Sequence, residues 1–235
     1  MIDGRDIKVG DIQRAATEVI RSNSRPVLIY LAIFVPLTSL ANWLDVQMGF
    51  ISPSETDWGA QVQTQNGLIG IVVLLASLAG QYLLFEKMLF GDHVAADRVT
   101  RILGFIGLAF VSFLGVGLAT LFLIVPGLFV ASRWLMCPAI YVGEGKGVFE
   151  SLGESWRRTK GHTGTVMLAI VLLVLIAIVL GLLLGGFSLA GGSASSGYLA
   201  DGVMSEIWTV LVIALSVGTY NVLVNPGARL ADTFA

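Results

Sequence analysis

The sequence predicts an all-α integral membrane protein with six transmembrane helices and amphipathic surface helices before spans 1 and 5. Hydrophobic residues make up 55% of the 235-residue chain and charged residues 13%, a balance that an ordinary soluble domain does not have. A helix crosses a hydrocarbon core of about 30 Å with about 20 apolar residues. Apolar stretches of about that length or more lie near residues 26–44, 67–90, 102–143, 165–190 and 203–224.

The third apolar stretch, 102–143, is about twice as long as one span needs. Pro126 and Gly127 stand near its middle, and a Pro-Gly pair is a turn signal. We therefore interpret the stretch as a hairpin of two helices joined at this pair. The chain is then a single membrane domain over residues 1–235, with spans at about 26–45, 67–88, 102–124, 127–143, 165–188 and 205–224.

The charges support the hairpin independently, because short cytoplasmic loops collect Lys and Arg. With six spans and a cytoplasmic N-terminus, every Lys and Arg except Arg133 falls on the inner side. The outer loops, 46–66 and 189–204, carry acidic residues and no basic one. A single span over 102–143 would move the later loops to the opposite side and mix the charges. The sequence therefore predicts that both termini are cytoplasmic.

Amphipathic patterns precede the first and the fifth span. In 11–22, Asp11 can cap a helix whose apolar side chains share one face and whose charged side chains lie opposite. In 147–160, apolar residues that include Trp156 recur at helical spacing opposite a charged face. Both patterns are typical of helices that lie on a membrane surface. We predict surface helices over 11–22 and 147–160, on the inner side.

Two short segments near the start of the chain resemble two segments near its end. Glu18-Val-Ile-Arg21 precedes the first span as Glu154-Ser-Trp-Arg157 precedes the fifth. Gly80-Gln-Tyr82 in the second span resembles Gly218-Thr-Tyr220 in the sixth. This similarity suggests the hypothesis that spans 1–2 and 5–6 form a parallel repeat.

Small residues at four-residue spacing permit close packing between helices. Ala76 pairs with Gly80 in this way, and Gly181 pairs with Gly185. Packing within one bundle is the favoured interpretation of this spacing, and a homodimer interface is the alternative.

No motif in the sequence points to catalysis. There is no H-E-x-x-H, no G-x-S-x-G and no pair of carboxylates within a span. Gly143-Glu-Gly-Lys-Gly147 lacks the spacing of a phosphate-binding loop and follows no strand. Asp92, His93 and Asp97 match no metal-ligand pattern, and a solvated loop explains them better. We therefore predict no enzyme, no catalytic residue, no metal site and no cofactor, and the formal charge of −2 argues against a nucleic-acid partner.

Arg133 is the exception among the basic residues, because it lies inside the predicted fourth span. On a straight helix it is about 10 Å from Pro126 and about 16 Å from Glu144, and a charge there costs on the order of 3 kcal/mol. The candidate partners are the carboxylates of Asp45, Glu86 and Glu206 and the carbonyl of Trp134, which Pro138 leaves without its usual donor. Two interpretations stay open. The arginine stabilises the hairpin by binding carbonyls or reaching the surface, or it binds an anionic lipid head group or substrate.

The same region carries a resemblance to a known family. The residues concerned are Val125-Pro-Gly127, Arg133-Trp134, Pro138, Glu144-Gly-Lys-Gly147, Glu154-Ser-Trp156 and Lys160-Gly161, with Val9-Gly-Asp-Ile12 near the start. Together they resemble the glycerophosphoryl diester phosphodiesterase membrane-domain family, which overlaps with the YciC-like bacterial inner-membrane proteins. The resemblance implies a six-helix domain of the bacterial inner membrane, sometimes fused to a soluble phosphodiesterase barrel. No soluble segment in these residues is long enough to form that barrel, so the catalytic activity in the family name is not carried over.

The function predicted from these observations is that of a non-enzymatic, multi-pass inner-membrane protein that organises or handles lipids or another amphiphile. The expected partners are membrane lipids, anionic ones among them, and a second copy of the chain or a partner membrane enzyme. The alternative is a small transporter with a cavity near Arg133. The candidate functional or structural residues are Pro126, Gly127, Arg133, Trp134, Pro138, Glu144 and Trp156.

Overall fold

The fold is described by a computed structural model that covers residues 7–47, 68–91, 98–191 and 194–224. Within these ranges the chain is helical and contains no strand. The helices are α1 (Val9–Ser22), α2 (Ser24–Gln47), α3 (Leu68–Phe90), α4 (Arg98–Phe122), α5 (Ile124–Trp134), α6 (Cys137–Glu144), α7 (Val148–Arg158), α8 (Thr163–Gly191) and α9 (Ala194–Val224).

Six helical stretches among the described residues are long and apolar enough to cross a membrane. They are Ser24–Leu44, Gly70–Phe90, Arg98–Phe122, Ile124–Glu144, Thr163–Leu183 and Leu199–Val224. The predicted all-α fold with six membrane-length helices is thus confirmed, and the chain is a multi-pass membrane protein.

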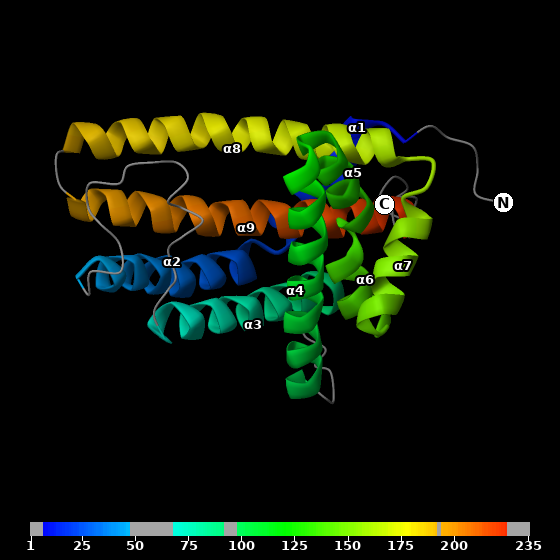
Figure 1. Ribbon diagram of the computed structural model, residues 1–235, viewed down its shortest axis with the longest axis horizontal. Helices are drawn as coiled ribbons and strands as arrows, with labels where there is room; N and C mark the ends of the chain where they lie inside the picture. The colour runs from blue at the N-terminus through cyan, green and yellow to red at the C-terminus, as the bar shows by residue number, and fades with distance from the viewer. Residues whose placement is uncertain (1–6, 48–67, 92–97, 192–193, 225–235) are drawn as a thin grey trace.

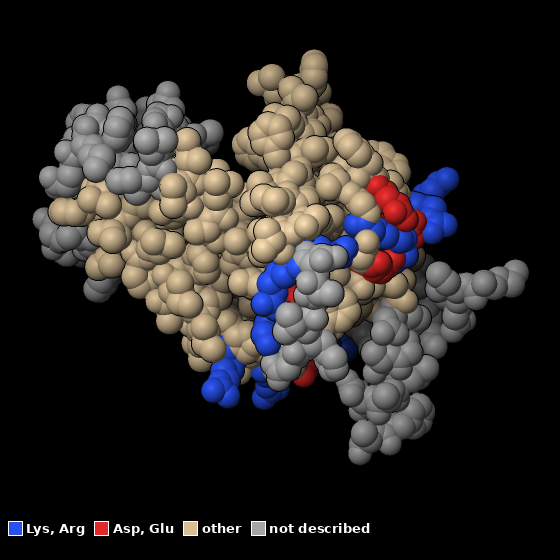
Figure 2. Space-filling model, turned by 90° about the horizontal axis from the view of Figure 1, so that it is seen from below, with Lys and Arg blue, Asp and Glu red and all other residues tan. Residues whose placement is uncertain are grey.

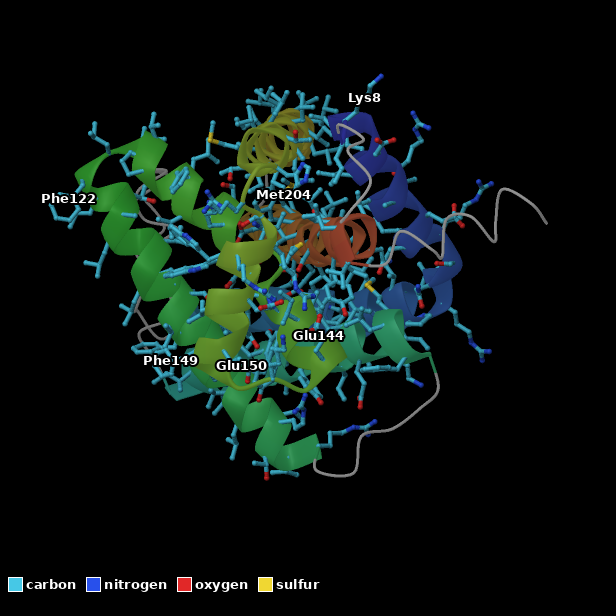
Figure 3. All side chains as sticks on the ribbon, turned by 90° about the vertical axis from the view of Figure 1, so that its right-hand side faces the viewer. Lys8, Phe122, Glu144, Phe149, Glu150 and Met204 are labelled. Atoms are coloured by element: carbon cyan, nitrogen blue, oxygen red, sulfur yellow. The ribbon has the colours of Figure 1, made fainter. Side chains whose placement is uncertain are left out.

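The helices run in different directions (Figure 1). α2, α3, α8 and α9 run side by side along the length of the molecule and form its main bundle. α4 and α5 run crosswise to this bundle, near one end of it. Figure 3 looks along α8 and α9, and there α4 is seen lengthwise, with Phe122 at its far end.

The core lies where the crosswise helices meet the bundle. Phe105 of α4 packs against Tyr82 and Phe85 of α3, with ring centroids 5.8 Å apart in both pairs. Its ring also lies 6.3 Å from that of Tyr141 in α6. Val217 of α9 is fully buried in the same cluster. Burial of aromatic and branched side chains therefore fixes the crosswise helices against α3 and α9.

The turn between α4 and α5 lies three residues before its predicted place at Pro126 and Gly127. α4 ends at Phe122, and Leu123 has extended backbone with φ −166°. Pro126 is the third residue of α5, where a missing N–H costs no hydrogen bond because the first N–H groups of a helix have no partner within it. The two helices predicted within 102–143 are present, and the boundary between them lies two to three residues earlier than predicted, because the sequence signal of proline does not distinguish a turn from a first helical turn.

Gly127 serves packing instead. A Cβ atom at this position would lie 2.0 Å from Oγ1 and 2.8 Å from Cα of Thr120 in α4. The glycine thus allows the two arms of the hairpin to approach closely, as glycines do at helix contacts. The small residues of the bundle act in the same way. Gly80 faces Tyr30 and Phe34 of α2, and Gly181 faces Met204 of α9, which supports the interpretation of packing within one bundle.

The helices predicted before the first and fifth spans exist as α1 and α7. α1 begins before the predicted 11–22, and Asp11 is its third residue and not its cap. The Asp11 carboxylate accepts a hydrogen bond of 3.2 Å from the Lys8 backbone N–H, so it still stabilises the helix start. α7 begins one residue after the predicted start at 147 and ends two residues before the predicted end at 160. That either helix lies on a membrane surface stays a prediction, as does the parallel repeat.

The predicted outer loop 189–204 is mostly helical, because α8 extends to Gly191 and α9 begins at Ala194. Gly202 is buried against α2, where an added Cβ atom would lie 2.1 Å from Ser39 Oγ and 3.2 Å from the Val35 carbonyl oxygen. In this part of the predicted loop the chain is therefore helical and packs closely on α2 at Gly202. The other predicted outer loop, 46–66, lies largely outside the described residues.

Candidate functional site

A helix break follows Arg133 and Trp134. α5 ends at Trp134, and α6 begins at Cys137 with Pro138 as its second residue, so the helical stretch Ile124–Glu144 is interrupted at residues 135–136. The break leaves carbonyls without helical donors. The Arg133 carbonyl accepts a hydrogen bond of 2.7 Å from Ser155 Oγ of α7, and the Leu135 carbonyl accepts one of 2.7 Å from Ser216 Oγ of α9. The break is therefore the point where α7 and α9 attach to this segment.

The Arg133 side chain contacts α7 as well. Its Nη1 donates a hydrogen bond of 3.1 Å to the Trp156 carbonyl, close to the C-terminal end of α7. The guanidinium carbon lies 5.2 Å from the ring centre of Phe129 and 5.3 Å from that of Trp156, within cation–π range. Both kinds of contact hold α5 against α7, as the stabilising interpretation of Arg133 predicts.

The predicted acidic partners of Arg133 bond elsewhere. Glu206 accepts hydrogen bonds of 2.8 Å from Tyr30 Oη and from Thr38 Oγ1, both on α2. Glu86 forms an ion pair of 3.1 Å with Arg98. The side chain of Asp45 lies outside the described residues. The prediction that Glu206 or Glu86 pairs with Arg133 was wrong, because helix direction, which composition does not encode, decides which spans face each other.

Trp134 and Trp156 form one aromatic cluster with Arg133. Their rings meet edge to face at 6.4 Å, and Phe129 meets Trp156 in the same way at 5.8 Å. A Cβ atom on Gly115 of α4 would lie 2.1 Å from the Trp134 ring, so the indole sits directly against the α4 backbone. This cluster joins α4, α5 and α7.

Glu144 belongs to a separate network of charges at the end of α6. Its carboxylate forms a bidentate ion pair with Arg158, contacts Lys146 Nζ at 3.1 Å and accepts a hydrogen bond of 3.2 Å from Tyr220 Oη. Arg158 also bonds Glu154 on its own helix. The network connects α6, α7 and α9 and pairs acidic with basic groups, so its contacts hold these three helices together.

Hydrogen bonding keeps Glu154 ionised in this network. Arg157 Nη2 lies 2.7 Å from Glu154 Oε1. This hydrogen bond is the main cause that lowers the pKa of Glu154 from 4.5 to about 2; burial opposes it, and Arg158 and Lys146 add to it. Figure 3 labels Glu144 and Glu150 near this end of the molecule.

The candidate residues do not form one site. Arg133, Trp134 and Trp156 lie together, while Glu144 lies in the charge network. Pro138 lies at the helix break. Pro126 and Gly127 lie in the first turn of α5, beside the turn of the hairpin.

A partly open cavity of about 190 Å³ lies beside the break, between α3, α4, α6 and α9. Apolar side chains dominate its lining, and polar ones are placed among them. Ser112 Oγ is buried there without a hydrogen-bond partner in the described part of the chain. Residues that line the cavity include Gln81, Phe105, Ser112, Pro138, Trp208 and Ser216.

Sequence reasoning missed most of this cavity, and it did not find the partners of Glu206 on α2. Pro138 alone of the predicted candidates lines the cavity, and Arg133 does not. The available signal is the isolated polar residue within an apolar span, such as Gln81 or Ser112. Glu206 carries the same signal: it is an isolated carboxylate in an apolar stretch, lies within α9 and is 4% exposed.

Within the described ranges, no group of three or more His, Cys, Asp and Glu side chains comes together to hold a metal ion. Asp92, His93 and Asp97 lie outside those ranges. Comparison of the chain with protein-family models, with curated proteins and with solved structures finds no match in any of the three. The family resemblance carried by Arg133, Trp134 and Glu144 therefore stays a prediction.

Proposed function

We propose that the chain is a non-enzymatic protein of the bacterial inner membrane, with both termini cytoplasmic, that holds or organises lipids or another amphiphile. The observation that carries this proposal is the cavity beside the helix break. It is partly open, apolar in most of its lining and lies among helices of membrane length. Ligand sites of this kind accept apolar groups and orient them with a few polar contacts.

The polar side chains in the lining favour a chain that carries an oxygen function over a plain hydrocarbon. Ser112 Oγ is buried without a partner in the described part of the chain, so a ligand acceptor there would satisfy it. Gln81 and Thr209 line the same cavity. The ester region of an acyl chain has this combination of apolar and hydrogen-bond-accepting groups, and a partly open cavity of about 190 Å³ takes this part of a lipid and not the whole chain.

Basic side chains favour an anionic amphiphile. Figure 2 shows Lys and Arg side chains along the lower middle and the right of this face, with Asp and Glu side chains among them, while the described atoms at the far left are uncharged. Arg98 and Arg101 begin α4, one of the helices that form the cavity. Such residues attract anionic head groups at a membrane surface.

The transport alternative is not favoured by any contact of Arg133. Its guanidinium binds the Trp156 carbonyl and the rings of Phe129 and Trp156, and it is not among the residues that line the cavity. A homodimer or a partner membrane enzyme stays part of the proposal as a way in which lipid would be passed on.

The test is to fill the cavity. Ala109 lines it, and Ala109→Leu adds apolar volume inside it; Ala32→Leu makes the same change on an exposed face of α2 and serves as the matched control. Native mass spectrometry of the purified proteins measures retained phospholipid. We expect several-fold less bound lipid in Ala109→Leu and wild-type retention in Ala32→Leu. Equal retention in both variants, with both folded, would refute the cavity as the lipid site.

A further inference from the structure

The crosswise helices touch the bundle near one end of it. Phe105 of α4 packs on Tyr82 and Phe85, which lie in the second half of α3. Leu135, the residue after α5, packs against the buried cluster that contains Val166, in the first turn of α8. The end of α3 and the start of α8 lie at the same end of the bundle in Figure 1.

The part of the hairpin that extends beyond these contacts is exposed and apolar. Leu121 and Phe122 are each 81% exposed, and Ile124 is 76% exposed. From residue 102 to residue 131 the sequence contains no charged side chain. An apolar surface of this extent is not left in water by a folded protein.

The tip of the hairpin is unlike an outer loop. The segments predicted to lie outside contain Glu55, Asp57 and Asp201, whereas the tip reads Leu121-Phe-Leu-Ile-Val-Pro126. A hairpin that crossed the whole membrane would present this tip at the outer surface. A hairpin that lies within the hydrocarbon keeps it among acyl chains, where its side chains need no polar partner.

The base of the hairpin is held at the basic end of the bundle. Arg98 forms its ion pair with Glu86 near the end of α3. Arg101 donates hydrogen bonds of 2.8 Å to the Tyr141 carbonyl and 3.1 Å to the Gly145 carbonyl, at the C-terminal end of α6. Both arms thus return to the same end, the one where Lys and Arg gather in Figure 2.

We propose that the α4–α5 hairpin lies along the membrane, inside the leaflet at the basic end, and that the acyl chains of this leaflet cover its exposed face. α2, α3, α8 and α9 then cross the membrane. Because the hairpin enters and leaves on one side, all other loops keep their sides and the separation of charges is preserved. Anionic head groups complement the basic residues at its base, which selects this leaflet. The inference does not depend on lipid binding in the cavity.

Depth measurements along the membrane normal test this placement. A fluorescent thiol label is attached at Phe122→Cys, and at Ile124→Cys as a second tip position in case the first variant does not fold. The native Cys137 is fully buried and does not compete for the label. Leu168→Cys and Leu183→Cys are matched references, because both are exposed positions on α8 and they lie about 22 Å apart along it.

The labelled proteins are reconstituted into phospholipid vesicles, and an impermeant energy acceptor is added to one side. Maleimide labelling of Lys160→Cys identifies the basic side, and that of Ser54→Cys identifies the other. We expect an acceptor on the basic side to quench the Phe122 label as strongly as the Leu168 label and several-fold more than the Leu183 label. Brominated acyl chains should quench the Phe122 label too.

Three outcomes overturn the proposal. If the label at Phe122→Cys is quenched as weakly as the label at Leu183→Cys, the tip lies in the other leaflet and the hairpin crosses the membrane. If Phe122→Cys in vesicles reacts with an impermeant maleimide, the tip lies in water. If two copies of Phe122→Cys form a disulfide with each other, and brominated acyl chains do not quench the label at this position, a second copy covers the hairpin.

Discussion

Replacing Arg133 by alanine tests whether this residue stabilises the hairpin or binds a ligand. The substitution removes the 3.1 Å hydrogen bond to the Trp156 carbonyl and the stacking on the rings of Phe129 and Trp156. A hydrogen bond from a charged donor contributes about 1.5–3 kcal/mol, and each half-exposed cation–π contact about 0.5–1 kcal/mol. We expect the free energy of unfolding to fall by about 3 kcal/mol, since part of the sum is offset by solvation of the released groups.

The assay is thermal unfolding of the purified protein in detergent. A loss of about 3 kcal/mol lowers the Tm by roughly 6–12 °C in a chain of this size. Arg133→Lys should recover part of the loss, because it keeps the charge but not the planar group that stacks on aromatic rings. Arg25→Ala, on an exposed position of α2, is the control and should leave the Tm unchanged.

A different pattern would refute the reasoning. If Arg133→Ala unfolds at the wild-type Tm while it loses bound anionic lipid, the guanidinium holds a ligand and the contacts with α7 are incidental. Lipid retention per folded molecule therefore has to be measured beside the Tm, with Arg25→Ala as the same control.

Further predictions concern the attachment of α1 and the charge network. Gly218→Ala would place a Cβ atom 2.6 Å from the backbone N and 2.9 Å from the Cα of Ala16, so α1 has to move; we expect a loss of about 1–3 kcal/mol in thermal unfolding and faster proteolysis of α1. Gly107→Ala, with nothing within 4 Å of the new atom, should instead stabilise the helix by up to about 1 kcal/mol. The pKa of Glu154 is lowered from 4.5 to about 2, so its contribution to stability is complete above about pH 4.5 and is lost as the pH falls towards 2. Glu154→Gln should therefore flatten this part of the Tm profile against pH, whereas the exposed Glu150→Gln should not; equal slopes in both variants would contradict the role of the network.

Composition and spacing predicted the helices well because a membrane-length helix is a property of one local segment. An apolar run of about 20 residues has few other stable forms in hydrocarbon, where every backbone group has to be bonded within the chain. The limits of α4 and α5 were harder, because a proline at a turn and a proline in the first turn of a helix look alike in sequence. The prediction of a loop over 189–204 was wrong for residues 194–204, which belong to α9 and pack on α2 at Gly202, a long-range contact that local composition does not encode.

The candidate site was harder to predict because it depends on direction and on distant pairs. Tyr30 and Glu206 are 176 positions apart, and no local pattern assigns them to each other. The hydrophobicity of a segment also does not determine whether its helix runs along the bundle or across it. Arg133 was recognisable as an exception among the basic residues, but its partner is a backbone carbonyl, which every residue possesses and which leaves no mark in a sequence.

The helix break explains why an arginine stands in an apolar run. Irregular backbone at membrane depth is tolerated only where protein groups satisfy it. Here Ser155 and Ser216 supply hydroxyl donors to the Arg133 and Leu135 carbonyls, and both donors come from helices far along the chain. The first of them works only while α7 lies against α5. The Arg133 guanidinium, bonded to the Trp156 carbonyl and stacked on its ring, holds α7 in that place. The arginine and the break are therefore linked through α7: if α7 moved away, the Arg133 carbonyl would lose the hydroxyl donor of Ser155 and the Arg133 guanidinium would lose the Trp156 carbonyl.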